Sequence, residues 1–332
     1  MTKRAPDPTV GCMTPDGRKS EMKLVPLVIA ALGLAAAAAI ALHQAVGGAP
    51  VADSASARCN TPTARFGPTV VQAEYREAQV HFTCAGATIA GTLTLPPGGG
   101  PHPAVVFVHG SGKAGRYTWR APFVQAFVRG GIAVLSYDKR GVGESGGTCC
   151  PGDYGHFNLL AADADGAVSA LRARADVERD RIGLIGASQA GWVVPLATVR
   201  SRGHVAFTAL VDGPAVSGGE ERRWSELAGE EDADAPTLTA QRRHELERKL
   251  GGPSGFDPRP YLARMTTPGL WLYGGRDRSV PTARSAATLR DLRGKHFEVV
   301  VYPRAGHGLL DTPPSDQRAL PTLVAWVQLV TG

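Results

Sequence analysis

The segment that decides the fold is Arg181-Ile-Gly-Leu-Ile-Gly186-Ala187-Ser188-Gln189-Ala190-Gly191-Trp192. Its first part is the apolar run of a buried strand, and residues 189–200 are predicted to form a helix. Between them, small residues surround Ser188 in a tight turn. A strand, tight turn and helix in this order lift a serine side chain above the edge of a sheet, where its hydroxyl can act as a nucleophile.

The turn is a variant of the G-x-S-x-G pattern. Gly186 occupies the first glycine position, whereas Ala190 stands where the last glycine usually lies, and Gly191 follows it. The pattern needs small residues because the backbone is strained and the helix packs close to the strand. One added methyl group keeps this requirement, so we predict Ser188 as the nucleophile.

Two further polar residues follow predicted strands. Asp277 lies just after the strand 269–273, and His307 lies in a glycine-flanked turn after the strand 297–302. A serine hydroxyl is a poor nucleophile at neutral pH, so an imidazole must take its proton and a carboxylate must hold the imidazole in place. We predict His307 as the base and Asp277 as the acid. Asp212, which follows an earlier strand, is the rival for the acid.

These motifs, with Tyr137-Asp-Lys-Arg-Gly-Val-Gly-Glu-Ser145, resemble the α/β-hydrolase superfamily. Among its bacterial members, the sequence is most similar to dienelactone-hydrolase-like and S33-type, serine-aminopeptidase-like proteins. The resemblance covers roughly residues 78–331, and the order serine, aspartate, histidine matches the order in that superfamily. The departures from the family pattern are Ala190 and an insertion that matches no known motif.

The resemblance also implies an oxyanion hole, which is a pair of N–H groups that bind the developing negative charge. In this superfamily one N–H comes from the loop after an early strand and the other from the residue after the nucleophile. Here these are Ser111, in the loop after the strand 104–108, and Gln189. His109 is expected to be structural, and Asp138 and Arg140 are expected to organise their loop through ion pairs. The chemistry requires no metal and no organic cofactor.

Strand and helix patterns alternate along the chain, which predicts an α/β-hydrolase fold. The expected architecture is a mostly parallel, doubly wound sheet with an antiparallel N-terminal strand and a helical lid insertion. The predicted strands are 78–83, 88–95, 104–108, 132–137, 181–185, 206–211, 269–273 and 297–302. The predicted core helices are 122–129, 159–174, 189–200, 282–292 and 321–330.

The pattern breaks between residues 213 and 267, where a charged stretch with helices near 220–226 and 239–250 is inserted between two strands. We predict a lid over the carboxyl edge of the sheet within a hydrolase domain of residues 58–332. A peptidase acting on free amino termini needs acidic residues near the site, and the lid contains such residues: Glu220, Glu221, Glu230, Glu231 and Asp232. The same residues also fit a solvated helix face.

Residues 1–57 are predicted to be an export signal or a membrane anchor with a linker. Residues 24–42 are uncharged and rich in Ala and Leu, and Lys19 and Lys23 precede them. Their length lies between that of a signal-peptide core and that of a membrane span. The small residues Ala55-Ser56-Ala57 are typical of a cleavage site. The expected location is therefore periplasmic or extracellular, with or without membrane attachment.

Four cysteines follow residue 57, an even number that suggests disulfides in an exported protein. Cys59 and Cys84 are the preferred pair because both flank the first strands. The adjacent Cys149 and Cys150 form either a vicinal disulfide or two free thiols. No Cys/His spacing is typical of a zinc site.

Composition excludes several function classes. A chain of 332 residues that is 43% hydrophobic can bury a large core, which excludes a disordered protein. The net charge of +6 comes from dispersed basic residues, and no nucleic-acid motif is present. The glycines at 141, 143 and 146 fit G-x-G-x-x-G, but no helix follows them, which disfavours dinucleotide binding. The predicted substrate is a carboxylic ester; the alternatives are a peptide or thioester, or binding without catalysis.

Overall fold

The computed structural model describes residue 59 and residues 64–119, 121–150, 156–229, 237–292, 294–310 and 315–332. The predicted export segment, residues 24–42 within residues 1–57, lies outside these residues. Within the described ranges, none of the helices combines the length and the apolar character that crossing a bilayer requires.

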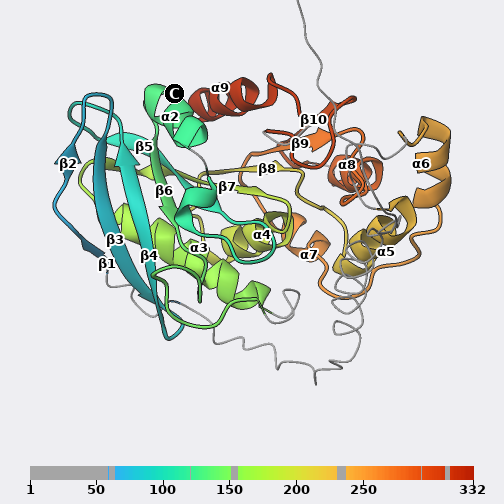
Figure 1. Ribbon diagram of the computed structural model, residues 1–332, viewed down its shortest axis with the longest axis horizontal. Coiled ribbons are helices and arrows are strands. Elements are labelled where there is room, and N and C mark those ends of the chain that lie inside the picture. Colours follow the sequence, from blue (N-terminus) through green and yellow to red (C-terminus); the bar gives the residue numbers. More distant parts are fainter. Residues whose placement is uncertain are drawn as a thin grey trace, which may run out of the picture. The chain divides into compact units, whose positions relative to one another are not determined.

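The strands of the described residues form one ten-stranded mixed sheet (Figure 1). Its order is β1-β3-β4-β6-β5-β7-β8-β9-β10, and β2 pairs with β3. The strands are β1 Ala64–Phe66, β2 Val70–Val71, β3 Arg76–Cys84, β4 Ala87–Leu95, β5 His102–Val108, β6 Ala133–Tyr137, β7 Val177–Ala187, β8 Phe207–Val211, β9 Gly269–Gly274 and β10 Phe297–Tyr302.

The predicted doubly wound α/β sheet is confirmed, but its antiparallel part is larger than predicted. β6, β5, β7, β8, β9 and β10 are parallel, whereas β1, β2 and β4 all pair antiparallel with their neighbours. β1 and β2 have three and two residues, too few to show a period in the sequence.

Helices cover both faces of the sheet, because the parallel strands carry apolar side chains on both sides. On β5, Ala104, Val106 and Val108 join the core cluster that contains residues of α3 and α4, and Val105 and Phe107 join the cluster that contains residues of α2 and α9. The helices are α2 Ala121–Arg129, α3 Phe157–Arg172, α4 Ala190–Arg200, α8 Thr282–Asp291 and α9 Ala319–Thr331.

The inserted segment carries three helices between β8 and β9: α5 Gly218–Ala228, α6 Ala240–Glu247 and α7 Arg259–Leu262. α5 begins with a capping box in which Ser217 and Glu220 bind each other's backbone N–H groups. Trp224 and Ala228 of α5 pack against Leu246 and Leu250. The sequence analysis missed α7, a helix of only four residues that contains a proline.

The cysteines lie as the predicted pairing requires. The Cα atoms of Cys59 and Cys84 are 4.6 Å apart, within the range of disulfides, and their Sγ atoms face each other. Cys149 and Cys150 also place their Sγ atoms side by side. The Cys59–Cys84 disulfide stays a prediction, and Cys149 and Cys150 stay either a vicinal disulfide or two thiols.

Candidate active site

The turn between β7 and α4 holds Ser188 in a strained conformation. Its φ of 53° lies in the left-handed region, which residues other than glycine rarely adopt. The Ser188 N–H donates to the carbonyl oxygen of Val211 at 2.9 Å, and the Gly191 N–H donates to that of Ser188 at 2.8 Å. These two bonds fix the turn, so the side chain stands above the edge of the sheet.

The unusual Ala190 is accommodated because Gly186 lies opposite it. A Cβ atom on Gly186 would lie 2.3 Å from the Cβ of Ala190. A Cβ atom on Gly191 would lie 2.5 Å from the backbone nitrogen of Pro214. The one added methyl group therefore fills the space that Gly186 leaves.

Gly186→Ala is therefore expected to lower the free energy of unfolding by about 2 kcal/mol or more, because its new methyl group overlaps Ala190. Adding Ala190→Gly removes one of the two overlapping groups and is expected to restore about half of this loss. The recovery is incomplete because a glycine destabilises the helix. Urea unfolding of the two single variants and the double variant measures the coupling. Additive losses would contradict the steric explanation.

His307 connects Ser188 to Asp277 through two hydrogen bonds. Its Nδ1 lies 2.9 Å from Oδ2 of Asp277, and its Nε2 lies 3.1 Å from Oγ of Ser188. A carboxylate only accepts, so Nδ1 carries the proton and the lone pair of Nε2 faces the serine hydroxyl. The other Asp277 oxygen accepts the N–H groups of Ser279 and Val280 at 2.7 Å each. Asp277 is thus held with one oxygen toward the imidazole.

Asp212, the rival acid, has a different set of partners. Its Oδ1 accepts the N–H of Gly274 at 2.9 Å, and its Oδ2 accepts the N–H groups of Gly308 and Leu309 at 3.1 and 3.0 Å. It thereby ties the histidine loop to the end of β9. Burial, and secondly the charge of Asp277, raise the pKa of Asp212 to about 7.

Ligand atoms of Asp212, Asp277 and His307 lie within 4.8 Å of one another, which is close enough for a metal ion. The carboxylate oxygens already accept backbone N–H groups, however, and one Asp277 oxygen accepts from His307. The donor set therefore fits a held imidazole better than a metal ion.

The buried side chain of Lys139 binds both the loop after β5 and the start of α4. Lys139, 2% exposed, donates from Nζ to the carbonyl oxygens of Gly110 and Gly112 at 3.1 Å each and to Oε1 of Gln189 at 2.9 Å. Ser111 lies between the two glycines. Ser111, Ser188 and Gln189 together line a cavity of about 60 Å³. Lys139 thus connects the loop that carries Ser111 to Gln189, the other predicted oxyanion-hole residue.

Lys139 was not predicted from the sequence, although it lies within the motif that suggested the family. Its neighbours were predicted to form ion pairs, and both do. Asp138 binds Arg116 at 2.8 Å, and Arg140 binds Asp163 at 2.7 and 2.8 Å. The only signal for Lys139 was a lysine two residues after a strand that is buried throughout.

His109 is structural, as expected. Its side chain is buried, its Nε2 contacts the carbonyl oxygen of Tyr137, and its ring meets the Tyr137 ring edge to face. Burial lowers the pKa of His109 to about 4. The imidazole is therefore neutral at physiological pH.

This shift predicts a pH dependence of stability. Between pH 6.5 and about 4 the unfolded chain binds a proton at His109 that the folded chain does not, so stability rises with pH. The contribution, about 3 kcal/mol, is present above pH 6.5 and is lost as pH falls to about 4. Urea unfolding of the wild type and His109→Gln, which keeps a donor for Tyr137, isolates this group. Equal pH dependence in the two proteins would refute the assignment.

Two cavities adjoin Ser188. One, of about 220 Å³, is largely apolar, and its lining includes Phe123, Leu309 and Leu310 beside Ser188 and His307. The other is the 60 Å³ cavity, whose lining includes Glu221 of the insertion. Glu220 is wholly buried and binds Ser217 and Arg259, so it does not face the site. The lid carboxylates at 230–232 lie outside the described residues.

Residues 99–246 match the family model described as serine aminopeptidase, S33. Esterase EstD of Thermotoga maritima is 28% identical over 241 residues, which are 66% of this chain and 57% of EstD. The uncharacterized protein YfhR of Salmonella typhi is 34% identical over 128 residues, 38% of this chain and 40% of YfhR. The chain thus spans about half the length of the curated relatives that it matches.

Solved structures extend the likeness to most of the chain. Acetyl xylan esterase 1 from Thermoanaerobacterium superimposes with a TM-score of 0.59 at 20% identity, over 82% of this chain and 89% of its own. The chain has the α/β-hydrolase fold, and its family match and curated relatives support membership of that superfamily. The Pyrococcus furiosus esterase Pf2001 shares the fold, with a TM-score of 0.56 at 19% identity over 80% of this chain and 97% of its own.

Proposed function

We propose that this α/β-hydrolase cleaves carboxylic esters through a Ser188–His307–Asp277 triad and an acyl-enzyme. The observation that carries the proposal is the chain of two hydrogen bonds from Asp277 through His307 to a serine in a strained turn. The esterases among its relatives support the substrate class.

The proposed reaction has two halves. Nε2 of His307 takes the proton of Ser188 as Oγ attacks the ester carbonyl, and Asp277 stabilises the imidazolium. The tetrahedral intermediate collapses, the leaving alcohol takes the proton from His307, and an acyl group remains on Ser188. Water, deprotonated by His307, then attacks the acyl group. The second tetrahedral intermediate collapses to release the acid, and His307 returns the proton to Oγ of Ser188. No metal and no organic cofactor take part in these steps.

The backbone N–H groups of Ser111 and Gln189 are proposed to bind the oxyanion. In a trans peptide the carbonyl and the following N–H point in opposite directions. Because Lys139 binds the carbonyl of Gly110, the N–H of Ser111 is turned away from the lysine. Lys139 is thus a positioning residue, which holds the donors without touching the substrate.

Lys139→Met is expected to lower kcat by about 10- to 100-fold with little change in KM, because the donors act in the transition state. Lys139→Arg keeps a cationic donor and is expected to recover part of the loss. Steady-state kinetics with p-nitrophenyl acetate, together with the melting temperature of each folded variant, separate this role from a structural one. An effect confined to KM or to stability would exclude the positioning role.

A peptidase is the second candidate. Glu221 lines the small cavity beside Ser188, where a carboxylate could bind the free amine of a peptide, and the family model carries a peptidase description. The 220 Å³ apolar cavity favours an acyl group of moderate size and therefore the esterase.

A substrate panel separates the candidates. It contains p-nitrophenyl esters with two to twelve acyl carbons, an acyl thioester and aminoacyl p-nitroanilides. The proposal expects the highest kcat/KM for short or medium esters, and an aminoacyl anilide as the best substrate would assign a peptidase instead.

We also propose that the protein is exported. The support is the apolar segment 24–42 with its basic flank, together with the facing cysteine pairs. Fractionation of cells, with the amino terminus of the mature chain determined, tests export and distinguishes cleavage from anchoring.

A further inference from the structure

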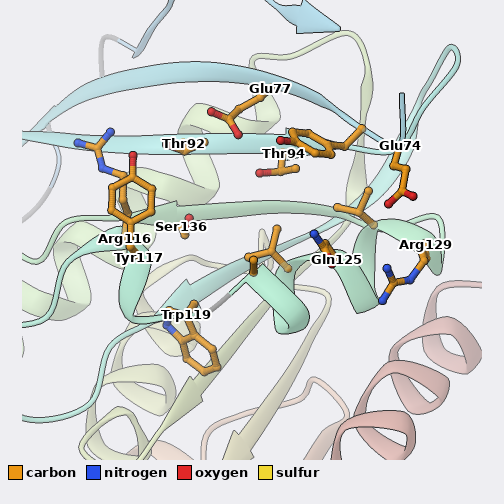
Figure 2. A pocket seen from close by; sticks show the side chains of 14 residues that line it. Glu74, Glu77, Thr92, Thr94, Arg116, Tyr117, Trp119, Gln125, Arg129 and Ser136 are labelled. Carbon is orange, nitrogen blue, oxygen red and sulfur yellow. The ribbon is translucent and has the colours of Figure 1, made fainter. Parts of the chain in front are cut away.

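Another cavity, separate from the two beside Ser188 and of about 220 Å³, lies over one face of β3, β4 and β6 (Figure 2). The pairing of these strands places polar side chains on the floor of the cavity. Glu77 of β3 is the cross-strand partner of Thr94 on β4, and Thr92 on β4 is the partner of Ser136 on β6. Directly paired residues point to the same face of a sheet, so these side chains form one polar surface.

The hydroxyls of Thr94 and Ser136 on this floor form no hydrogen bond with a described residue. Both residues line the cavity, and they are 8% and 6% exposed. Neither hydroxyl oxygen is among the fully buried atoms without a partner, so both open onto the cavity. A ligand that fills the cavity with hydroxyl groups of its own would satisfy both.

Aromatic rings form part of the wall. Tyr75, Tyr117 and Trp119 line the cavity, and Tyr117, on the short 3-10 helix Arg116–Thr118, is 80% exposed. An exposed aromatic ring at the mouth of a polar cavity offers a flat apolar face to the C–H groups of a ligand. The hydroxyls of the floor and the aromatic rings of the wall together suit a ring-shaped ligand with polar groups at its edge and C–H groups on its face.

The charged residues of the lining have both signs: Glu74 and Glu77 are acidic, and Arg116 and Arg129 are basic. The Arg116 guanidinium is engaged by Asp138 and Glu144, at 2.8 Å each, and by Gln79 at 2.7 Å. Charges of both signs thus surround the cavity, and Arg116 already has carboxylate partners, which favours a ligand without a net charge.

We propose that this cavity, the Thr94 cavity, binds a glycosyl ring of a neutral saccharide. Trp119 lines both the Thr94 cavity and the apolar cavity beside Ser188. The two cavities therefore adjoin at Trp119, and binding in the Thr94 cavity is proposed independently of catalysis at Ser188.

Binding is tested in the full chain carrying Ser188→Ala, which needs no turnover. The probes are methyl β-glucoside, cyclohexanol, glucosamine and glucuronate, titrated by NMR. The neutral glycoside is expected to bind best. Glu77→Gln or Tyr117→Ala should weaken its binding by about tenfold, and Thr94→Val by severalfold. Thr88→Val, the same substitution on the same strand outside the cavity, is the control and should leave binding unchanged.

Several outcomes would overturn the proposal: no binding of the glycoside, tighter binding of the charged sugars or of cyclohexanol, or binding that the cavity variants do not change. Catalysis is tested apart from binding, because hydrolysis of p-nitrophenyl acetate by the wild type reports on Ser188 alone.

Discussion

Ser188→Ala is expected to lower kcat for p-nitrophenyl acetate by about 10⁴-fold or more, because no acyl-enzyme can form. The substitution removes only Oγ, which hydrogen-bonds His307, and leaves the backbone bonds of the turn intact. The protein should therefore keep its melting temperature, or gain slightly. Stopped and continuous assays of the purified variant, with active-site titration of the wild type, measure the loss.

Ser111→Ala is the matched control. Ser111 lines the same small cavity, but the proposal uses its backbone N–H and not its hydroxyl. Its loss of kcat should be smaller by orders of magnitude than that of Ser188→Ala. Comparable losses in the two variants would contradict the assignment of the nucleophile.

Asp277→Asn is expected to lower kcat by about 10⁴-fold with little change in fold, because the amide no longer favours the imidazole tautomer that serves as a base. Asp212→Asn is its natural counterpart, since the two buried carboxylates lie in one cluster. Asparagine at 212 keeps one oxygen for three N–H donors. We expect a lower melting temperature and only about a tenfold loss of activity through the loosened histidine loop.

The ratio of the two losses decides between the acids. A larger kinetic loss in Asp212→Asn than in Asp277→Asn, at equal folded fraction, would make Asp212 the acid that serves His307. Assays at several pH values around 7 are needed, because the raised pKa of Asp212 changes its charge in that range.

The sequence allowed the parallel core and the strand–turn–helix around Ser188 to be predicted because both have local signals. Strands buried on both faces read as continuous apolar runs, and the elbow needs small residues at fixed offsets. The same reasoning placed Asp277 and His307 after neighbouring strands. In the structure, His307 lies within hydrogen-bond distance of both Asp277 and Ser188.

What escaped prediction depends on contacts between distant segments. Lys139 meets Gly110 and Gln189, 29 and 50 residues away, and no local pattern encodes that meeting. The Thr94 cavity arises from the register of three strands, and the threonines alone read as ordinary outward positions of a strand. Glu220 belongs to a charged run that fits a solvated helix face. In the structure it is wholly buried and pairs with Arg259, 39 residues away.

The most direct test of the central claim is labelling of the full chain with a fluorophosphonate, followed by mass spectrometry of the peptides. The proposal predicts one phosphonylated residue, Ser188, with labelling abolished by Ser188→Ala and strongly slowed by His307→Ala and Asp277→Asn. Labelling at another serine, or a folded wild type that takes up no label, would contradict an activated nucleophile at Ser188.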